Sequence, residues 1–262
     1  MNINNMNNIL DIKHAFYINL ASRPDRKQHV EEQLQIIGIH AERFDAIKLA
    51  NGAIGCSMSH IKCLETAKKN NWPHLLVVED DIKFLDPELF KKQTTSFLSK
   101  HAEWDVVIVG GNNVPPYQKI DDTCVKISSC QTTTGYLVNG HYFDTLIENF
   151  RTGVKKLMEN PQLHAMYAID KYWFNLQKKD NWYLIIPLTV TQREDYSDIE
   201  KKATNYTNVM TDLDKEWFFN KQPPVVPTNK ITKLSITNEP IKSNIRLNTG
   251  AAKPSMKIDM KF

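Results

Sequence analysis

Three consecutive acidic residues, Glu79, Asp80 and Asp81, directly follow the apolar run HLLVV at residues 74–78. A continuous apolar run of this kind predicts a strand buried on both faces. Adjacent carboxylates repel one another and are costly to bury unpaired, but they are tolerable at the C-terminal end of a strand, where open α/β sheets bind ligands. Mg²⁺ or Mn²⁺ binds through one or two carboxylates, water and substrate phosphates. The position therefore favours a metal site over the alternative, a solvated acidic turn.

Sequence motifs of several other enzyme classes are absent from the chain. It contains no GxxxxGKS/T loop, no GxGxxG fingerprint and no GxSxG elbow. A phosphatase with an aspartyl nucleophile would show a DxDxT/V run, whereas this chain reads EDDIKF. By elimination, a nucleoside diphosphate held through a divalent cation becomes the favoured ligand of the acidic triplet.

Composition sets outer limits on the function. Of the 262 residues, 41% are hydrophobic and 24% charged, which is enough apolar material for a sizeable core. The 33 basic and 30 acidic residues leave a formal net charge of +3, without the concentrated basic face of a nucleic-acid-binding protein. The N-terminus lacks the pattern of a secretory signal, and no apolar stretch approaches the roughly 18–20 residues that span a bilayer. We therefore expect a cytoplasmic protein with no nucleic-acid partner and no transmembrane segment.

The four cysteines predict reduced thiols. Cys56 and Cys63 share one predicted helix and are separated along it by about 10.5 Å, whereas a disulfide needs Cα atoms within about 7 Å. Cys124 and Cys130 lack the CxxC spacing of a zinc or redox site.

Strand-like and helix-like segments alternate along the chain. Apolar residues at helical spacing predict helices at about 24–37, 54–69, 87–99, 141–150 and 163–178. Apolar runs predict strands at about 14–20, 42–46, 74–78, 105–109, 124–128, 133–138 and 182–190. This alternation predicts an α/β fold with a mixed, mostly parallel sheet flanked by helices. Beyond a predicted short helix at 214–220 the chain becomes polar, so we expect a catalytic domain at 11–210 and a tail at 211–262 that wraps it or is partly disordered.

A series of short blocks, in a fixed order from about residue 14 to residue 200, carries a family resemblance. The blocks are Tyr17-Ile18-Asn19-Leu20 with Arg23, Asp25 and Arg26; Arg43-Phe44-Asp45-Ala46; Gly52-Ala53-Ile54-Gly55-Cys56 with Ser59-His60; Glu79-Asp80-Asp81; Trp104-Asp105 before Gly110; Gly135-Tyr136; Ala168-Ile169-Asp170; and Gln192 with Tyr196-Ser197-Asp198-Ile199-Glu200. In this order and spacing they resemble glycosyltransferase family 25, which includes bacterial lipooligosaccharide galactosyltransferases and procollagen galactosyltransferases. Roughly the last 50 residues lie outside the resemblance.

The resemblance implies a nucleotide-sugar-binding, Rossmann-like domain of GT-A type and transfer with inversion at the anomeric carbon. It points to UDP-galactose or UDP-glucose as the donor, Mn²⁺ or Mg²⁺ as the cation, and a hydroxylysine-type protein or an oligosaccharide as the acceptor. Such a transfer needs a cation to neutralise the departing UDP, a general base on the opposite face of the sugar and a donor held for in-line attack.

For the cation we predict Glu79 and Asp81 as ligands, because residues two apart in an extended segment point the same way. Asp80 would contact the ribose or act from outside the metal shell. For the donor we predict residues at strand ends and at a helix start, where guanidinium and backbone N–H groups suit a diphosphate. They are Asn19, Leu20, Arg23, Arg26, Gly55, Ser59, His60, Asp80, Ser197 and Asp198. The alternatives are a capped surface helix for the two arginines and a structural hydrogen bond for the histidine.

For the general base we predict Asp170. It lies in a segment dense with apolar and aromatic residues, where a lone carboxylate otherwise makes little sense and partial burial suits a proton acceptor. The alternative is that Asp170 forms a structural ion pair or caps a loop. Asp195 and Asp144 are the other candidates.

Two further functions stay open at this point. One is a catalytically silent domain that binds a nucleotide sugar, although the intact acidic triplet speaks against it. The other is a metal-dependent phosphohydrolase or nucleotidyltransferase, which would release phosphate or pyrophosphate rather than transfer a sugar.

Overall fold

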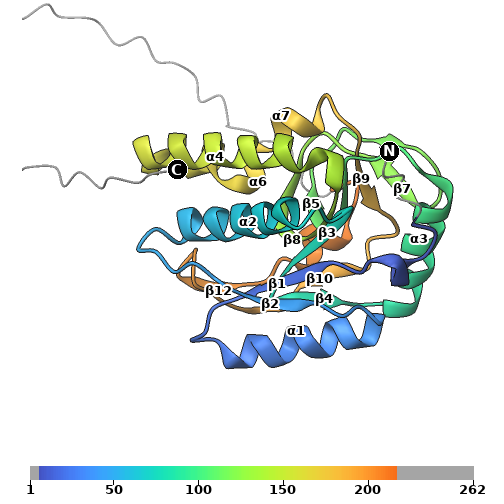
Figure 1. The fold of residues 1–262 in the computed structure, drawn as a ribbon, viewed down its shortest axis with the longest axis horizontal. Coiled ribbons are helices and arrows are strands. Elements are labelled where there is room, and N and C mark those ends of the chain that lie inside the picture. Colours follow the sequence, from blue (N-terminus) through green and yellow to red (C-terminus); the bar gives the residue numbers. More distant parts are fainter. Residues whose placement is uncertain (1–5, 217–262) are drawn as a thin grey trace, which may run out of the picture. The chain divides into compact units, whose positions relative to one another are not determined.

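An eight-stranded sheet forms the centre of residues 6–216, the part of the chain that the computed structural model describes (Figure 1). The strand order is β2-β1-β3-β8-β5-β9-β7-β6. The strands are β1 (Ala15–Asn19), β2 (Glu42–Asp45), β3 (His74–Glu79), β5 (Val106–Asn113), β6 (Gln118–Lys119), β7 (Cys124–Lys126), β8 (Cys130–Asn139) and β9 (Trp182–Ile185). Only β7 and β8 run against the direction that the other strands of this sheet share. The predicted mixed, mostly parallel sheet is therefore confirmed.

Four long helices flank the sheet, two on each face. They are α1 (Pro24–Ile37), α2 (Gly52–Lys69), α3 (Pro87–Lys100) and α4 (Phe143–Glu159). In Figure 1, α2 and α4 lie above the sheet and α1 lies below it. Local signals set their ends: proline occupies the first turn of α1 and α3, the side chains of Asn51 and Asp86 cap α2 and α3, and Gly38 ends α1 with a left-handed φ of 77°.

Two apolar layers, one on each face, explain the continuous hydrophobic run in β3. Val77 packs with side chains of α2 and α4, such as Leu64 and Leu146. Its neighbour Val78 packs with side chains of α1 and α3, such as Leu34. Successive side chains of a strand point to opposite faces, so a strand between two helical layers must be apolar at every position.

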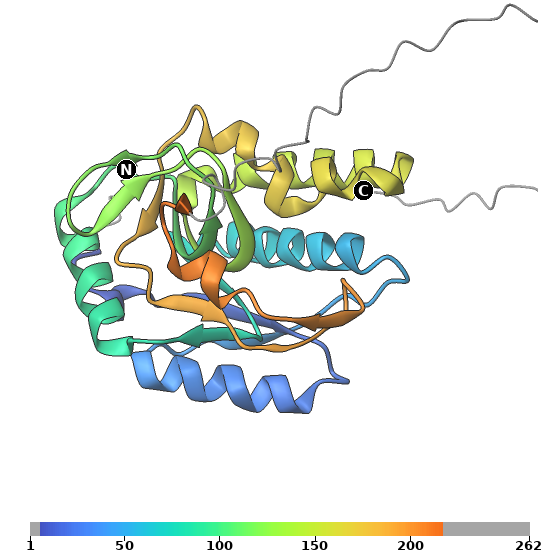
Figure 2. The same cartoon turned by 180° about the vertical axis from the view of Figure 1, so that it is seen from behind.

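After β3 the chain turns and leaves the main sheet. Residues 80–81 form the turn, and β4 (Ile82–Phe84) then pairs antiparallel with β10 (Val190–Gln192). A hairpin of β11 (Asp195–Ser197) and β12 (Lys202–Thr204) follows, and then the short helix α8 (Thr207–Thr211), which packs against β5 and β10 (Figure 2). The predicted strand 182–190 is thus divided between β9 and β10.

The single helix predicted at 163–178 is wrong. After the 3₁₀ turns η2 (Gly140–Tyr142) and η3 (Pro161–Leu163), the region forms three one-turn helices: α5 (His164–Tyr167), α6 (Ile169–Tyr172) and α7 (Phe174–Gln177). Ala168 is extended, with a ψ of 149°, and separates the first two. Trp173 and Gln177 both donate side-chain hydrogen bonds to the Cys130 carbonyl, so contacts with β8 override the helical periodicity.

The remaining differences concern element ends. β5, β8 and α4 are longer than predicted, and β6 lies in a segment for which neither a helix nor a strand was predicted. An additional 3₁₀ turn, η1 (Ile9–Asp11), precedes β1. The predicted helix 214–220 and tail 211–262 lie, from residue 217 onward, outside the described residues. Within residues 6–216 no helix combines the length and apolar character needed to cross a bilayer.

Gly55 provides a test of how tightly α2 is seated. A Cβ at this position would lie 2.4 Å from the Ile47 carbonyl oxygen and 3.3 Å from the Leu49 nitrogen. Both are backbone atoms, so the loop before α2 would have to move. We expect Gly55→Ala to lower the free energy of unfolding by about 1–3 kcal/mol, measured by urea denaturation.

Gly52→Ala, in the same helix, is the matched control. Its Cβ would meet the half-exposed side chain of Ile199 at 3.2 Å, and that side chain can move aside. A Gly55→Ala protein as stable as the Gly52→Ala protein would contradict the prediction.

Candidate active site

Most of the predicted site residues line one pocket. This central pocket, of about 540 Å³, opens at the ends of β1, β3 and β5. That edge of an α/β sheet is where ligands are expected. The predicted residues that line it are Leu20, Arg23, Arg26, Ser59, His60, Glu79, Asp80, Asp81, Asp170, Ser197 and Asp198. Asn19 and Gly55 were also predicted, but they do not line the pocket.

Asn19 and Gly55 support the pocket wall instead. The buried amide of Asn19 donates to Asp80 Oδ2 at 2.7 Å and accepts from Arg43 Nε at 3.0 Å. Gly55 lets the helix approach the preceding loop. Ser59 lines the pocket, but its hydroxyl is already engaged, donating to the Gly55 carbonyl and accepting from the Ile47 N–H. These three residues position their neighbours.

The acidic triplet divides between two sides of the pocket. Because residues 80–81 form a turn, the expectation of an extended segment through Asp81 is wrong. Asp80 and Asp81 both face Arg26, whose guanidinium donates to Asp80 Oδ1 at 3.0 Å and to Asp81 Oδ2 at 3.2 Å. Glu79 belongs to β3 and makes a separate set of contacts. Glu79 and Asp81 as joint metal ligands remain a prediction.

Asp81 has a carboxylate oxygen that no protein group satisfies. Its Oδ1 is buried and has no hydrogen-bond partner among the described residues. Burial and the negative charge of Glu79 raise the pKa of Asp81 to about 8, in spite of Arg26. A buried oxygen ligand without a partner, beside a second carboxylate, suits Mg²⁺ or Mn²⁺, which bind hard oxygen donors. The residues present therefore fit a divalent cation.

Arginine pairs connect helix α1 to the hairpin β11–β12. Arg23 contacts Asp195 Oδ2 at 2.6 Å and Asp198 Oδ2 at 2.8 Å, and Arg26 contacts Asp195 Oδ2 at 3.1 Å. Although burial acts to raise it, hydrogen bonds from the Tyr196 N–H and the two arginines hold the pKa of Asp195 at about 2. Asp195 is therefore a weak proton acceptor and a strong partner for cations.

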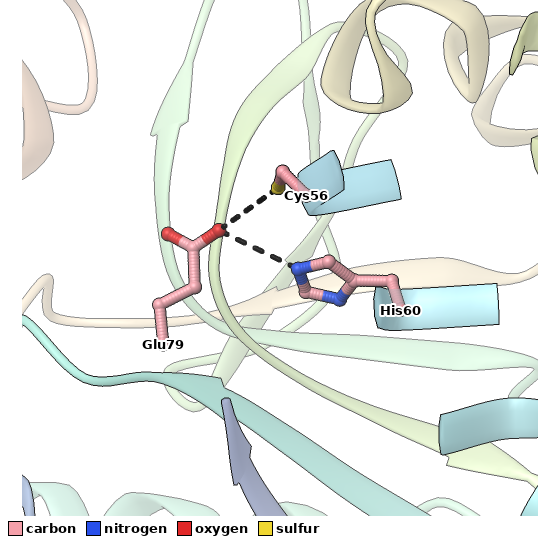
Figure 3. Close-up of side chains that lie close together, drawn as sticks. All are labelled: Cys56, His60 and Glu79. Atoms are coloured by element: carbon pink, nitrogen blue, oxygen red, sulfur yellow. Dashed lines mark hydrogen bonds and ion pairs between the residues drawn. The ribbon is translucent and has the colours of Figure 1, made fainter. Parts of the chain in front are cut away.

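Glu79 is surrounded by polar groups, of which the sequence analysis assigned only His60 to the site (Figure 3). Its Oε1 accepts a hydrogen bond from Thr133 Oγ1 at 2.6 Å and lies 3.8 Å from Cys56 Sγ and 3.5 Å from His60 Nε2. Its Oε2 accepts from Gln192 Nε2 at 3.3 Å. Cys56 precedes His60 by four residues on α2. Residues four apart lie on one face of a helix, so the sequence alone could have predicted that these two side chains are neighbours. The contributions of Thr133 and Gln192 have no comparable local signal.

His60 is completely buried. Its Nδ1 lies 2.8 Å from the Tyr136 hydroxyl, and Nε2 has no hydrogen-bond partner among residues 6–216. The imidazole ring thus makes a structural hydrogen bond, which was the alternative to donor binding in the sequence analysis. It also lines the pocket. Burial, together with the charges of Glu79 and Asp170, raises the pKa of the neighbouring Cys56 thiol well above its usual range.

Asp170, in α6, also lines the pocket. Its Oδ2 accepts a hydrogen bond from the Thr132 N–H at 3.1 Å and lies 3.6 Å from Lys171 Nζ. Thr132 has a φ of 67°, an uncommon value for a β-branched residue, and strain of this kind clusters at functional sites. The other candidate, Asp144, pairs with Lys68 on an exposed surface and does not line the pocket.

A family model described as "Glycosyltransferase family 25 (LPS biosynthesis protein)" matches residues 48–158. This match covers α2, the acidic triplet and the elements that follow it as far as α4, and curated relatives bear the same family name. This part of the chain is similar to glycosyltransferase family 25. The family resemblance predicted from the sequence is thus confirmed.

The relatives that the chain resembles differ in their named status. A glycosyltransferase 25 family member of Aedes aegypti is 25% identical over 207 residues, 66% of this chain and 33% of the relative. A Mus musculus relative, 23% identical over 189 residues (60% of this chain, 31% of the relative), is named inactive glycosyltransferase 25 family member 3. The chain spans about a third of the length of these relatives. A solved glycosyltransferase involved in glycosylation of the major capsid of PBCV-1 aligns at a TM-score of 0.38 and 12% identity, covering 65% of this chain and 80% of that one.

The raised pKa of Asp81 predicts a pH-dependent stability defect in the metal-free protein. A carboxyl whose folded pKa lies near 8, above its usual 3.8, stabilises the fold while protonated, and this contribution is lost as the pH rises from about 4 to about 8. Asp81→Asn removes the buried charge. In excess chelator we expect this variant to exceed the parent by at least about 1 kcal/mol at about pH 8, with a smaller difference at about pH 5, by urea denaturation.

Asp144→Asn, on the exposed surface, is the control and should unfold like the parent at both pH values. An Asp81→Asn protein that is equally stable, or less stable, at about pH 8 would mean that the carboxylate is compensated in the folded chain.

Proposed function

We propose that this chain transfers a hexose, galactose or glucose, from a UDP-sugar to an acceptor hydroxyl with inversion and with the help of a divalent cation. The acceptor is a hydroxylysine-type protein or an oligosaccharide. One observation carries the proposal: in a chain similar to family 25, a single pocket gathers the acidic triplet, two arginines and a separate carboxylate, Asp170.

The donor diphosphate is bound at the side of the pocket formed by α1 and the hairpin β11–β12. Arg23 and Arg26 pair with carboxylates in the ligand-free chain, and a diphosphate offers the same kind of oxygen to a guanidinium. Ser197 and Asp198 border this side. Asp80 acts from outside the metal shell, since its two oxygens already accept from Asn19 and Arg26.

Glu79 and Asp81 are the proposed ligands of Mn²⁺ or Mg²⁺, and the unpartnered Asp81 Oδ1 supports this role. A bound cation supplies positive charge to the departing UDP. Arg26 adds a second positive charge beside it and, being 12% exposed, is shielded from water that would weaken the interaction.

Asp170 accepts the proton of the attacking hydroxyl. It lines the same pocket as the triplet but comes from a different element, α6, and its hydrogen bond from Thr132 holds one oxygen while the other can face the acceptor. A base needs hydrogen-bonding reach to the proton it removes and a lone pair to accept it.

A catalytically silent, donor-binding domain is the second candidate, because several relatives of this chain are named inactive. The two functions are separated by following label from a UDP-sugar into a mixture of candidate acceptors by mass spectrometry. Label in an acceptor supports transfer, whereas donor binding without product supports the silent domain. Release of free phosphate would indicate a phosphohydrolase.

The donor class and its cation can be tested together by thermal stability. UDP-galactose or UDP-glucose with Mn²⁺ should stabilise the protein, by roughly 2.7 kcal/mol when the ligand is at about a hundred times its dissociation constant.

The role of the cation is tested by substituting one of its proposed ligands. Asp81→Asn removes a charge from the metal site, so the transfer of label to an acceptor should fall at least about a hundredfold.

GDP- and CMP-sugars serve as controls for the nucleotide. Stabilisation by these and not by UDP-sugars would overturn the donor assignment. Full transfer in excess chelator would overturn the role of the cation.

The role of Asp170 can be separated from donor binding. Asp170→Asn keeps the side chain's size but removes its ability to accept a proton, so transfer should fall by roughly 10²–10⁴ while UDP-sugar affinity persists. Transfer and affinity are measured by product formation and calorimetry. Asp144→Asn, outside the pocket, should behave like the parent. Normal transfer by Asp170→Asn would exclude it as the base, and lost donor affinity would assign it to binding.

A further inference from the structure

Cys56, His60 and Glu79 form a compact set of metal-ligating side chains in the wall of the central pocket (Figure 3). One ligand atom from each, the thiol sulfur, the imidazole Nε2 and a carboxylate oxygen, lies within 4.8 Å of the other two. Cys56 and His60 come from adjacent turns of α2, and Glu79 comes from the end of β3. We call these three residues the Cys–His–Glu cluster.

The spacing of the ligand atoms matches a tetrahedral ion. Zinc binds sulfur at about 2.3 Å and nitrogen or oxygen at about 2.0–2.2 Å, which puts neighbouring ligand atoms roughly 3.3–3.7 Å apart. In the structure Glu79 Oε1 lies 3.5 Å from His60 Nε2 and 3.8 Å from Cys56 Sγ. The nitrogen–oxygen separation exceeds a well-formed N–H···O bond of about 2.7–3.2 Å, whereas the sulfur–oxygen separation is that of a long hydrogen bond donated by the Cys56 thiol. The imidazole nitrogen and the carboxylate oxygen are thus spaced more like two ligands of one ion than like partners in a direct hydrogen bond.

The imidazole of His60 supplies a second, independent observation. His60 is fully buried, and its Nε2 has no hydrogen-bond partner among the described residues. The other ring nitrogen lies 2.8 Å from the Tyr136 hydroxyl. A proton on Nδ1 that is donated to Tyr136 leaves the Nε2 lone pair aimed at Glu79. Metal-binding histidines are commonly oriented by such a bond from the second nitrogen.

We propose that Cys56, His60 and Glu79 bind a zinc ion, whose fourth position opens to the central pocket. The donor set is sulfur, nitrogen and one oxygen, which favours zinc over the Mg²⁺ or Mn²⁺ proposed for Glu79 and Asp81. Glu79 is common to the two sites: its Oε1 faces Cys56 and His60, which leaves Oε2 for the second cation. The zinc site goes beyond the proposed transfer and does not depend on it. The ion ties the first half of α2 to the end of β3 and thereby fixes the carboxylate of Glu79.

Coordination has a defined proton balance. Zinc binds the thiolate, so Cys56 releases its proton to solvent when the ion enters. The thiolate and the carboxylate of Glu79 then neutralise the two positive charges. Thr133 and Gln192 hold the carboxylate through hydrogen bonds to Oε1 and Oε2, at 2.6 and 3.3 Å. Such outer contacts also raise metal affinity.

Cobalt(II) can be used to test this metal site in the absence of a UDP-sugar and of an acceptor substrate. We expect metal-stripped protein to bind one Co²⁺ with the charge-transfer absorption of a cobalt–thiolate bond, and Zn²⁺ to displace it. Cys56→Ser and His60→Gln each remove a direct ligand and should abolish the absorption and weaken Zn²⁺ binding beyond the roughly 10–100-fold seen for loss of an outer partner. Cys63→Ala, a buried thiol on the same helix outside the cluster, should keep both properties.

Asp81→Asn separates this site from the proposed hard-cation site and should retain the cobalt–thiolate absorption. Parent protein without that absorption would overturn the proposal, as would a Cys56→Ser protein that binds Zn²⁺ like the parent. Loss of Zn²⁺ binding in Asp81→Asn but not in Cys56→Ser would assign the ion to the acidic triplet and overturn the proposal. None of these measurements uses sugar transfer. A negative result for zinc binding therefore does not contradict the transferase proposal, and an absence of sugar transfer does not contradict the zinc site.

Discussion

The gathering of three adjacent carboxylates at the end of β3, one buried and two partly buried, is the constraint on which the rest of the site depends. Burial raises the pKa of both Asp80 and Asp81, which means that their charged forms are held at a cost. Arg26 offsets part of this cost by contacting both side chains. The same guanidinium donates to the Tyr196 carbonyl, so the charge of the triplet also determines where the hairpin β11–β12 lies.

The turn after β3 makes this arrangement possible. A strand that continued straight would carry the carboxylates along the sheet, whereas the turn at 80–81 sends the chain into β4 and its partner β10. β10 then brings two contacts to the triplet: Gln192 Nε2 donates to Glu79, and the Arg193 N–H donates to the Asp81 carbonyl at 2.7 Å. Residues more than a hundred positions apart in sequence therefore enclose one pocket.

The difference between what the sequence predicts and what it does not follows from the range of the interactions. Helix α1 was predicted at both ends because Pro24 and Gly38 act locally, and the triplet was located because an apolar run ends directly before it. The pairing of Arg26 with Asp195 spans 169 residues and has no local signal. The break at Ala168 likewise depends on hydrogen bonds to distant Cys130 rather than on the helical pattern around it. The fold class and most pocket residues could thus be predicted, but their partners could not.

Three of the buried polar atoms without hydrogen-bond partners in residues 6–216 belong to residues that line this pocket: Asp81 Oδ1, His60 Nε2 and Asn112 Oδ1. An unsatisfied buried group costs about 1–3 kcal/mol, a large share of a typical stability of about 5–15 kcal/mol. Such a cost, repeated in one pocket, is understandable if ligands supply the missing partners, since natural chains break local rules mainly at functional sites. The atoms of Asp81 and His60 differ in chemistry. A hard carboxylate oxygen beside Arg26 and a nitrogen beside a thiol select different cations, so ligand type rather than distance would keep the two proposed ions apart.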